Sequence, residues 1–234
     1  GLQIGGSDQW GNITGGIDLT RRLHGKQVFG LTLPLVTKAD GTKFGKTESG
    51  TIWLDATKTS PYAFYQFWLG TADADVYRFL RYFTFLPVDD IVAIEQADRD
   101  REGRPEAQRI LAREVTRLVH GEAGLTAAER ITEALFSGAP DTLAEADLQQ
   151  LALDGLPSNL LARDDFPPTF SQLLAQVGVA AGKQVKDALA REAVWVNGQP
   201  VSGGPTTNCD AALDKTQALH GRYFLIRFGK KKYH

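Results

Sequence analysis

The chain has 234 residues, 42% of them hydrophobic, and a formal net charge of −2 at pH 7. This length and apolar content suffice for one large core or two to three small ones. The apolar runs are far shorter than the ~20 residues that cross a bilayer. The single cysteine, Cys209, excludes an internal disulfide, and no His/Cys cluster has the spacing of zinc ligands. These features favour a globular cytoplasmic protein.

Charge is distributed unevenly along the chain. Residues 169–234 carry nine Lys/Arg and four Asp/Glu, a net charge of +5, which leaves −7 for residues 1–168. A basic end of this kind often binds nucleic acid, and a solvated basic surface is the simpler alternative. The chain contains no methionine and begins at Gly1 in what has the form of the middle of a motif. We therefore expect it to be a fragment of a longer protein.

The first two segments expected along the chain are an α/β segment and a helical one. Residues 1–57 are glycine-rich and contain strand-sized apolar runs such as FGLTLPLV at 29–36, which indicates part of an α/β sheet. Residues 58–136 form the helical segment. Ser60 and Pro61 have the form of an N-cap and a first helical residue, apolar residues then recur at helical spacing, and Gly121 is expected to end one of the helices.

Two further segments complete the chain. Residues 137–168 are acidic, contain four prolines and only scattered apolar residues, and are expected to be a linker. Residues 169–234 contain helical patterns at 170–178 and 183–191 and a closing strand at 223–228. Between them, Asn197-Gly198 separates two short apolar strands, which predicts a tight hairpin because both residues tolerate positive φ.

The segment GSDQWGN at residues 6–12 combines a carboxylate and two amides in a bend that glycine permits. Asp8 can accept from a pair of ribose hydroxyls, Gln9 can donate to a carbonyl or carboxylate, and glycine lets backbone amides approach a ligand closely. This combination suits a nucleotide. An ordinary polar turn above a packed Trp10 is the alternative.

A second glycine-containing loop, ADGTKFGKTESG at 39–50, is close to a phosphate-binding P-loop. That motif requires four residues between its first glycine and Gly-Lys-Ser/Thr, whereas only three separate Gly41 from Gly45. Recognition of phosphates would therefore depend on the ammonium groups of Lys43 and Lys46 and on the Thr47 hydroxyl, which can stabilise charge that develops on a leaving pyrophosphate. A surface turn rich in lysine and glycine is the alternative.

Taken together, GGSDQWGN and KADGTKFGKTESG resemble the second half of the catalytic domain of bacterial tyrosyl-tRNA synthetases, in which KFGKT is a variant of the class I KMSKS signature. The similarity continues through SPYAFYQFWL, YFTFL, LAREVTRLVHG and ALF. It ends in a C-terminal domain that resembles the small RNA-binding fold of ribosomal protein S-four. This resemblance implies a remnant of a Rossmann-type catalytic domain (1–57), an α-helical anticodon-binding domain (58–136), a linker (137–168) and a small α+β RNA-binding domain (169–234).

The resemblance also implies roles for individual residues. Asp8 and the backbone of Gly6 would hold the adenylate ribose, and Gln9 would contact the carboxylate or carbonyl of the activated tyrosine. Lys46 above all, together with Lys43 and Thr47, would engage the ATP phosphates. The implied reaction is formation of tyrosyl-adenylate and its transfer to tRNA(Tyr), with Mg²⁺ accompanying ATP, with no metal ligand expected from the protein, and with a homodimer as the intact enzyme.

The histidine motif of the HIGH type and the tyrosine pocket belong to the first half of that catalytic domain, and neither is found in these residues. We therefore expect the isolated chain to be unable to activate tyrosine. For tRNA, the expected contacts are basic residues of the C-terminal domain: Lys183, Lys186, Arg191, Lys230, Lys231 and Lys232. The alternatives are the related tryptophan enzyme and a non-catalytic module that only binds RNA.

Overall fold

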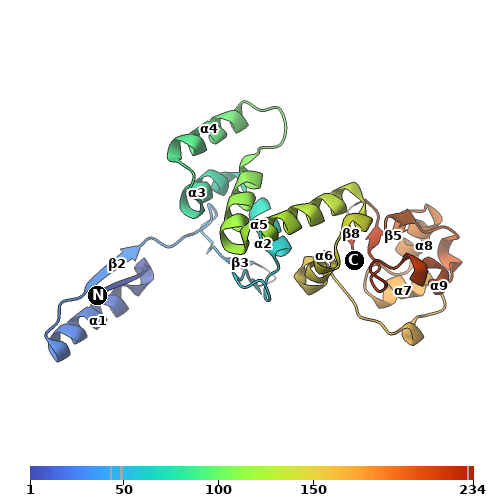
Figure 1. Ribbon diagram of the computed structural model, residues 1–234, viewed down its shortest axis with the longest axis horizontal. Helices are drawn as coiled ribbons and strands as arrows, with labels where there is room; N and C mark the ends of the chain where they lie inside the picture. Colours follow the sequence, from blue (N-terminus) through green and yellow to red (C-terminus); the bar gives the residue numbers. More distant parts are fainter. Residues whose placement is uncertain (43, 48–49, 231) are drawn as a thin grey trace. The chain divides into compact units, whose positions relative to one another are not determined.

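The structure, a computed structural model, describes residues 1–42, 44–47, 50–230 and 232–234 (Figure 1). The chain divides into two compact units, Gly1–Ile52 and Trp53–His234. The first unit is α/β, whereas the second contains a group of helices followed by a small domain of short helices and strands. In the described residues, no helix is both long enough and apolar enough to cross a membrane.

The first unit is built on a strand–helix–strand motif. Its elements are β1 (Leu2–Gly6), a 3-10 turn (Ser7–Gln9), α1 (Trp10–His24) and β2 (Phe29–Leu33). The two strands pair in parallel, with Ile4 opposite Leu31, and α1 provides the crossover that parallel neighbours need. Gly30 allows α1 to lie close to the sheet, because a Cβ at this position would be 2.4 Å from Cγ2 of the buried Ile13.

The helix α1 is the main departure from the sequence-based prediction in this unit, which expected short strands and a polar bend. Gly11, Gly15 and Gly16 lower the intrinsic helix propensity of this stretch, each by up to ~1 kcal/mol relative to alanine. The helix is nevertheless formed because Ile13 and Ile17, one turn apart, both approach Gly30 of the sheet. Packing against the strands therefore outweighs local propensity.

Four helices open the second unit: α2 (Pro61–Leu69), α3 (Asp73–Phe83), α4 (Val88–Arg99) and α5 (Ala107–Ser137). The predicted start of α2 is confirmed, since Ser60 Oγ accepts from Ala63 N at 3.0 Å and Pro61 occupies the first turn. Val76, Phe79 and Leu80 are buried on α3, as their spacing predicts.

The helix α5 does not end at Gly121 as predicted. Gly121 has φ 70° and ψ −178°, which interrupts the helix, but the chain turns helical again immediately and continues to Ser137. Figure 1 shows the resulting change of direction within α5. This region of φ/ψ space is almost restricted to glycine, so the residue makes a kink between two helical halves. The second half buries Leu125 and Ile131 completely.

Residues 140–155, which the sequence assigns to a linker, are packed. They form η2 (Pro140–Thr142), α6 (Glu145–Gln150) and the π-helical turn η3 (Leu151–Gly155). Leu143, Leu148 and Leu151 are each at most 4% exposed. Asp147 forms a two-bond ion pair with Arg130 of α5, with both N–O distances at 2.7 Å. The segment without helix or strand is therefore shorter than predicted, at residues 156–162.

The C-terminal part contains short helices around a four-stranded sheet. The elements are η4 (Arg163–Asp165), α7 (Phe170–Gln176), α8 (Lys183–Ala190), β5 (Val194–Val196), β6 (Gln199–Pro200), η5 (Gly204–Thr206), α9 (Cys209–Ala212), η6 (Lys215–Gln217), β7 (Ile226–Phe228) and β8 (Lys232–Tyr233). The sheet order is β6-β5-β7-β8 and the pairs are antiparallel. The predicted hairpin turn is present, with φ of 48° at Asn197 and 81° at Gly198.

This C-terminal part is docked on the end of α5 and on α6. A shared apolar cluster joins Ile131 and Leu148 to Leu225. Polar contacts surround it: the Tyr233 hydroxyl donates to the Leu135 carbonyl at 2.7 Å, and His220 Nε2 contacts the Leu143 carbonyl at 2.8 Å. These contacts come from residues far apart in sequence, so side-chain packing holds the domain in place in addition to the connecting chain.

Candidate functional site

The first candidate site lies at the carboxyl end of β1, where the strand passes into the 3-10 turn and α1. Gly6, Asp8 and Gln9 are adjacent there, and the side chains of Asp8 and Gln9 are exposed. Gly6 has a steric reason to be glycine: a Cβ would lie 2.6 Å from Asp8 Oδ1 and 2.8 Å from Leu35 Cδ2. Ligands of α/β sheets bind outside the carboxyl ends of the strands, at the position these residues occupy.

A short chain of hydrogen bonds orders the side chains of this site. Asn12 Nδ2 donates to Gln9 Oε1 at 3.0 Å, and Gln9 Nε2 points to Asp8 Oδ2 at 3.4 Å. Asn12 therefore fixes which end of the Gln9 amide carries the donor, and leaves Asp8 Oδ1 available as an acceptor. The sequence did not single out Asn12 as a site residue. The signal that the sequence offered was its spacing: Asn12 follows Gln9 by three positions, and residues three apart are neighbours on the surface of a helix.

The second candidate element is the lysine-containing loop. Lys46–Thr47 forms β3 and pairs antiparallel with β4 (Gly50–Thr51). Gly41 and Gly45 have φ of 82° and 87°, so the turns that precede β3 use backbone conformations that favour glycine. Lys43 lies outside the described residues, and of Lys46 and Thr47 only the backbone is described. The engagement of phosphates by these three side chains therefore remains a prediction.

The turn before this hairpin is held by Asp40. Its Oδ1 accepts from Thr42 Oγ1 at 2.6 Å and from Thr42 N at 2.9 Å. These two hydrogen bonds stabilise the carboxylate and lower the pKa of Asp40 below its ordinary value. At neutral pH the loop therefore carries a fixed negative charge beside Lys38, and this charge orders the turn.

The basic surface of the C-terminal domain is built on α8. Val185 and Leu189 face the core, whereas Lys183, Lys186 and Arg191 are exposed. Gly182, at the N-cap, has φ 62° and offers no side-chain cap to the first N–H groups of the helix. The start of α8 thus combines a lysine with uncapped backbone donors, an arrangement that favours anions.

One of the C-terminal lysines, Lys232, contacts the segment that precedes this helix. Lys232 Nζ donates to the carbonyl of Val179, which lies three residues before Gly182. That ammonium group therefore has a partner within the domain and fixes β8 near the start of α8. Lys230 is exposed in the turn that precedes β8, and Lys231 lies outside the described residues. The contact of Lys232 joins β8 to the segment before α8, although the two are far apart in sequence.

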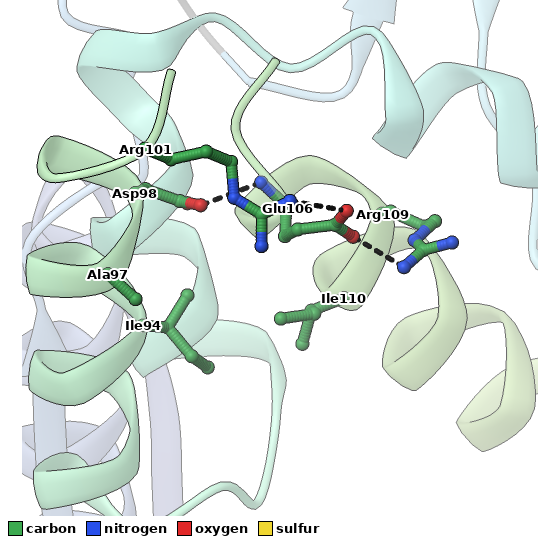
Figure 2. Close-up of a pocket in the computed structure, with 7 residues that line it drawn as sticks. All are labelled: Ile94, Ala97, Asp98, Arg101, Glu106, Arg109 and Ile110. Carbon is green, nitrogen blue, oxygen red and sulfur yellow. Dashed lines mark hydrogen bonds and ion pairs between the residues drawn. The ribbon is translucent and has the colours of Figure 1, made fainter. Parts of the chain in front are cut away.

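A cavity of about 350 Å³ lies between α4 and α5 in the helical segment (Figure 2) and is lined by Ile94, Ala97, Asp98, Arg101, Glu106, Arg109 and Ile110. Glu106 pairs with Arg101 at 3.0 Å and with Arg109 at 2.6 Å. Asp98 accepts from two backbone N–H groups at the start of α5, at 2.8 and 3.0 Å. Burial and the hydrogen bond to Asp98 raise the pKa of Tyr77 to about 12. The charged groups of this cavity stabilise the start of α5.

Within the described ranges, no group of three His, Cys, Asp or Glu side chains has the geometry of a metal site. The parallel strand–helix–strand arrangement, with polar side chains after the carboxyl end of β1, defines an α/β fold of the kind whose ligands bind outside such strand ends. A family model described as tRNA synthetases class I (W and Y) matches residues 1–137, and one described as the tyrosine–tRNA ligase SYY-like C-terminal domain matches residues 147–234. The chain belongs to the class I tRNA synthetases of the tryptophan and tyrosine group. The resemblance inferred from the sequence motifs is thereby confirmed.

Several individual proteins are similar over nearly the whole chain. The tyrosine–tRNA ligase of Aliivibrio fischeri (strain MJ11) is 63% identical over 231 residues, which is 98% of this chain and 53% of that protein. The corresponding ligase of Chromobacterium violaceum is 60% identical over 233 residues, with 99% and 53% covered. The chain thus spans about half the length of these relatives. A solved C-terminally truncated mitochondrial tyrosyl-tRNA synthetase of Coccidioides posadasii is 33% identical, with a TM-score of 0.45 over 54% of this chain and 38% of that one.

Proposed function

We propose that the chain is the part of a tyrosine–tRNA ligase that holds the adenylate ribose, the ATP phosphates and the tRNA. The observation that carries this proposal is the cluster of Gly6, Asp8 and Gln9 at the carboxyl end of β1, in a chain whose two parts match a synthetase catalytic model and a tyrosine–tRNA ligase C-terminal model. The similarity of the relatives named tyrosine–tRNA ligase supports tyrosine as the amino acid.

In the proposed chemistry, the protein positions two substrates and stabilises charge. Asp8 accepts from the ribose hydroxyls, and Gln9 donates to the carboxylate or carbonyl of tyrosine. Lys43, Lys46 and Thr47 bind the phosphates and stabilise the charge that develops on pyrophosphate as the tyrosine carboxylate attacks the α-phosphate. Mg²⁺ enters with ATP as part of the substrate.

The proposed tRNA contacts belong to the C-terminal domain, which we assign to the ribosomal-protein S-four type. They are exposed cations on α8 and after it (Lys183, Lys186, Arg191) and the lysines of the tail (Lys230, Lys231, Lys232). Phosphate contacts need positive charge within reach, and their free energy comes largely from counterion release. The helical segment would face the anticodon stem-loop.

The proposed organisation keeps a catalytic remnant at 1–57, a helical domain at 58–136 and an RNA-binding domain at 169–234. The packed residues 140–155 are then a bracket between the last two domains and only part of a linker. The whole enzyme would be a cytoplasmic homodimer, and this chain alone would not activate tyrosine. Measurable exchange of pyrophosphate into ATP by the purified chain would refute this last statement.

Binding of tRNA(Tyr) as a function of salt concentration tests the proposal. Because each phosphate contact contributes about −0.9 to the slope of log K against log salt, Lys183→Ala and Lys186→Ala should each make the slope less steep by about one. Lys26→Ala, which removes an exposed lysine from the other unit, is the matched control and should leave the slope unchanged. Equal slopes for all variants, or a slope that survives deletion of residues 169–234, would refute the assignment.

A further inference from the structure

The start of α2 is capped by side chains from the bracket of residues 140–155. The Ser60 N–H donates to Asp154 Oδ2 at 2.9 Å, and the Tyr62 N–H donates to Gln150 Oε1 at 3.1 Å. The N–H groups at the start of a helix have no partner within the helix itself. Here two of them depend on residues that follow 94 and 88 positions later in the chain.

The bracket also packs against the first turn of α2. A Cβ at Gly155 would lie 2.8 Å from Cδ1 of Tyr62, so the backbone of η3 passes directly over this ring. Tyr62 is 8% exposed and belongs to the apolar cluster that contains Leu148 of α6 and Leu225 of the C-terminal domain. The start of α2, the bracket and the C-terminal domain therefore share one core.

The C-terminal domain meets the end of α5 through a small number of side-chain and backbone contacts. Gly138, the C-cap of α5, has φ 76°, and a Cβ at Gly198 in the hairpin turn would lie 2.9 Å from the Gly138 carbonyl oxygen. The Tyr233 hydroxyl donates to the Leu135 carbonyl at 2.7 Å. We call these contacts, together with Leu225, the joint. The domain has a separate core of its own, around Phe170, so the joint can open while the domain stays folded.

The chain enters α2 from the hairpin of β3 and β4, which contains Lys46. Residues 52–59 alone separate the end of β4 at Thr51 from the N-cap at Ser60. The far end of this connection is fixed in the second unit, because Thr59 is 3% exposed and its Oγ1 accepts from the backbone N–H of Trp53 at 3.0 Å. Opening of the start of α2 would therefore release one end of the chain that leads out of the lysine hairpin.

We propose that the bracket transmits the docking of the C-terminal domain to the start of α2. While the domain is docked, Leu225 completes the cluster around Tyr62, and the caps from Gln150 and Asp154 are in place. When the joint opens, the cluster loses Leu225, and the bracket and its caps open more often.

The joint is defined by contacts within the second unit, whereas its consequence for RNA rests on the proposed function. RNA that binds the docked domain more tightly than the undocked one favours the docked state, and it thereby slows opening at the start of α2. The effect is reciprocal: an ordered start of α2 strengthens RNA binding by the same factor.

Amide hydrogen exchange in the full chain, resolved by residue with NMR, tests the joint. Gln150→Leu should speed exchange at the Tyr62 N–H about tenfold, because a cap hydrogen bond is lost. Tyr233→Phe removes only the hydroxyl that bonds α5, and it should also speed exchange at Tyr62, by about threefold.

Tyr223→Phe is the matched control, because the Tyr223 hydroxyl accepts from Arg222 within its own turn, and exchange at Tyr62 should stay unchanged. Transmission through the joint is refuted if Tyr233→Phe and Tyr223→Phe exchange equally at Tyr62, or if Gln150→Leu leaves that exchange unchanged.

Addition of saturating tRNA(Tyr) tests the consequence for RNA. In the unmodified chain, exchange at the Tyr62 N–H should slow at least about fivefold, and in Gln150→Leu this slowing should be absent. If tRNA binds but leaves exchange at Tyr62 unchanged in the unmodified chain, the link between RNA and α2 is overturned. If tRNA does not bind, the proposed function fails, and the comparison of Tyr233→Phe with Tyr223→Phe still decides the joint.

Discussion

Replacement of Asp147 by asparagine tests how the bracket of residues 140–155 is held. Asp147 is 1% exposed and accepts from Arg130 Nε and Nη2 at 2.7 Å each. It also accepts from the backbone N–H of Ala144 at 2.9 Å, at the start of α6. The Asn side chain has the same size but only one oxygen, so its amide NH₂ must face at least one N–H donor.

The expected loss can be worked from these contacts. Breaking a fully buried ion pair by removing one partner costs about 3–5 kcal/mol. Here Arg130 is 39% exposed and can be rehydrated, which lowers the cost. One hydrogen bond to the remaining oxygen also survives. We therefore expect Asp147→Asn to reduce the free energy of unfolding of the second unit by about 2–3 kcal/mol, close to the value of one or two charge-assisted hydrogen bonds.

Urea unfolding followed by circular dichroism measures this difference. Asp141→Asn, an exposed carboxylate in the same segment, is the matched control and should change the free energy by no more than about 0.5 kcal/mol. If Asp147→Asn unfolds at the same urea concentration as Asp141→Asn with an unchanged slope, the ion pair does not stabilise the bracket and the reasoning fails.

Three further predictions concern single residues. Burial lowers the pKa of His120 below 6.5. Just below pH 6.5 the unfolded chain therefore binds a proton that the folded chain does not, so the free energy of unfolding should fall as the pH drops below about 6.5. In urea titrations at several pH values, His120→Gln should make this fall less steep. A fall of equal steepness in His120→Gln would contradict this. Gly121→Ala should reduce the free energy of unfolding by about 1–3 kcal/mol, because Gly121 has φ 70° and ψ −178°, a conformation that alanine rarely adopts. Gly70→Ala, at φ −84°, is the control and should leave the free energy of unfolding nearly unchanged. Equal stabilities of the two variants would refute the argument. Burial raises the pKa of the Cys209 thiol to about 11, so a thiol reagent at pH 8 should react only after unfolding, and rapid labelling of the folded chain would show that the thiol is accessible.

Features that depend on a few neighbouring residues could be predicted from the sequence. The cap at Ser60 follows from local chemistry, because its side-chain oxygen can reach a backbone N–H in the next turn. The turn at Asn197-Gly198 also follows, because both residues tolerate the positive φ that a tight hairpin needs. The buried stripe of α3 follows from helical periodicity alone. In all three cases the residues that make up the pattern lie within a few positions of one another in the sequence.

Features that depend on distant partners were missed. Leu143, Leu148 and Leu151 look isolated in the sequence, and they are buried only because α2, α5 and the C-terminal domain meet around them. At Gly121, local chemistry predicted a helix end, whereas Leu125 and Ile131 continue the same core on the next turns. The sequence shows that Asp8 and Gln9 are adjacent. The hydrogen bond from Asn12 to Gln9 could not be predicted, because it depends on the helix α1, and three glycines lower the helix propensity of that segment.

The docking of the C-terminal domain on α5 and α6 has a consequence for how this protein tolerates insertions. The domain is held by Tyr233, His220 and the cluster around Leu225. In the segment at 156–162, Leu156 packs against this cluster and Asn159 Nδ2 donates to the Val177 carbonyl at 3.2 Å, and both residues come before Leu160. Extra residues placed after Leu160 would therefore leave the spacing between the α8 lysines and the helical segment unchanged. Their cost would be only the entropy of a longer closed loop, about 0.6 kcal/mol for each doubling of its length. The distance between the α8 lysines and the helical segment is therefore set by packed side chains, and the length of the connecting chain can vary without changing this distance.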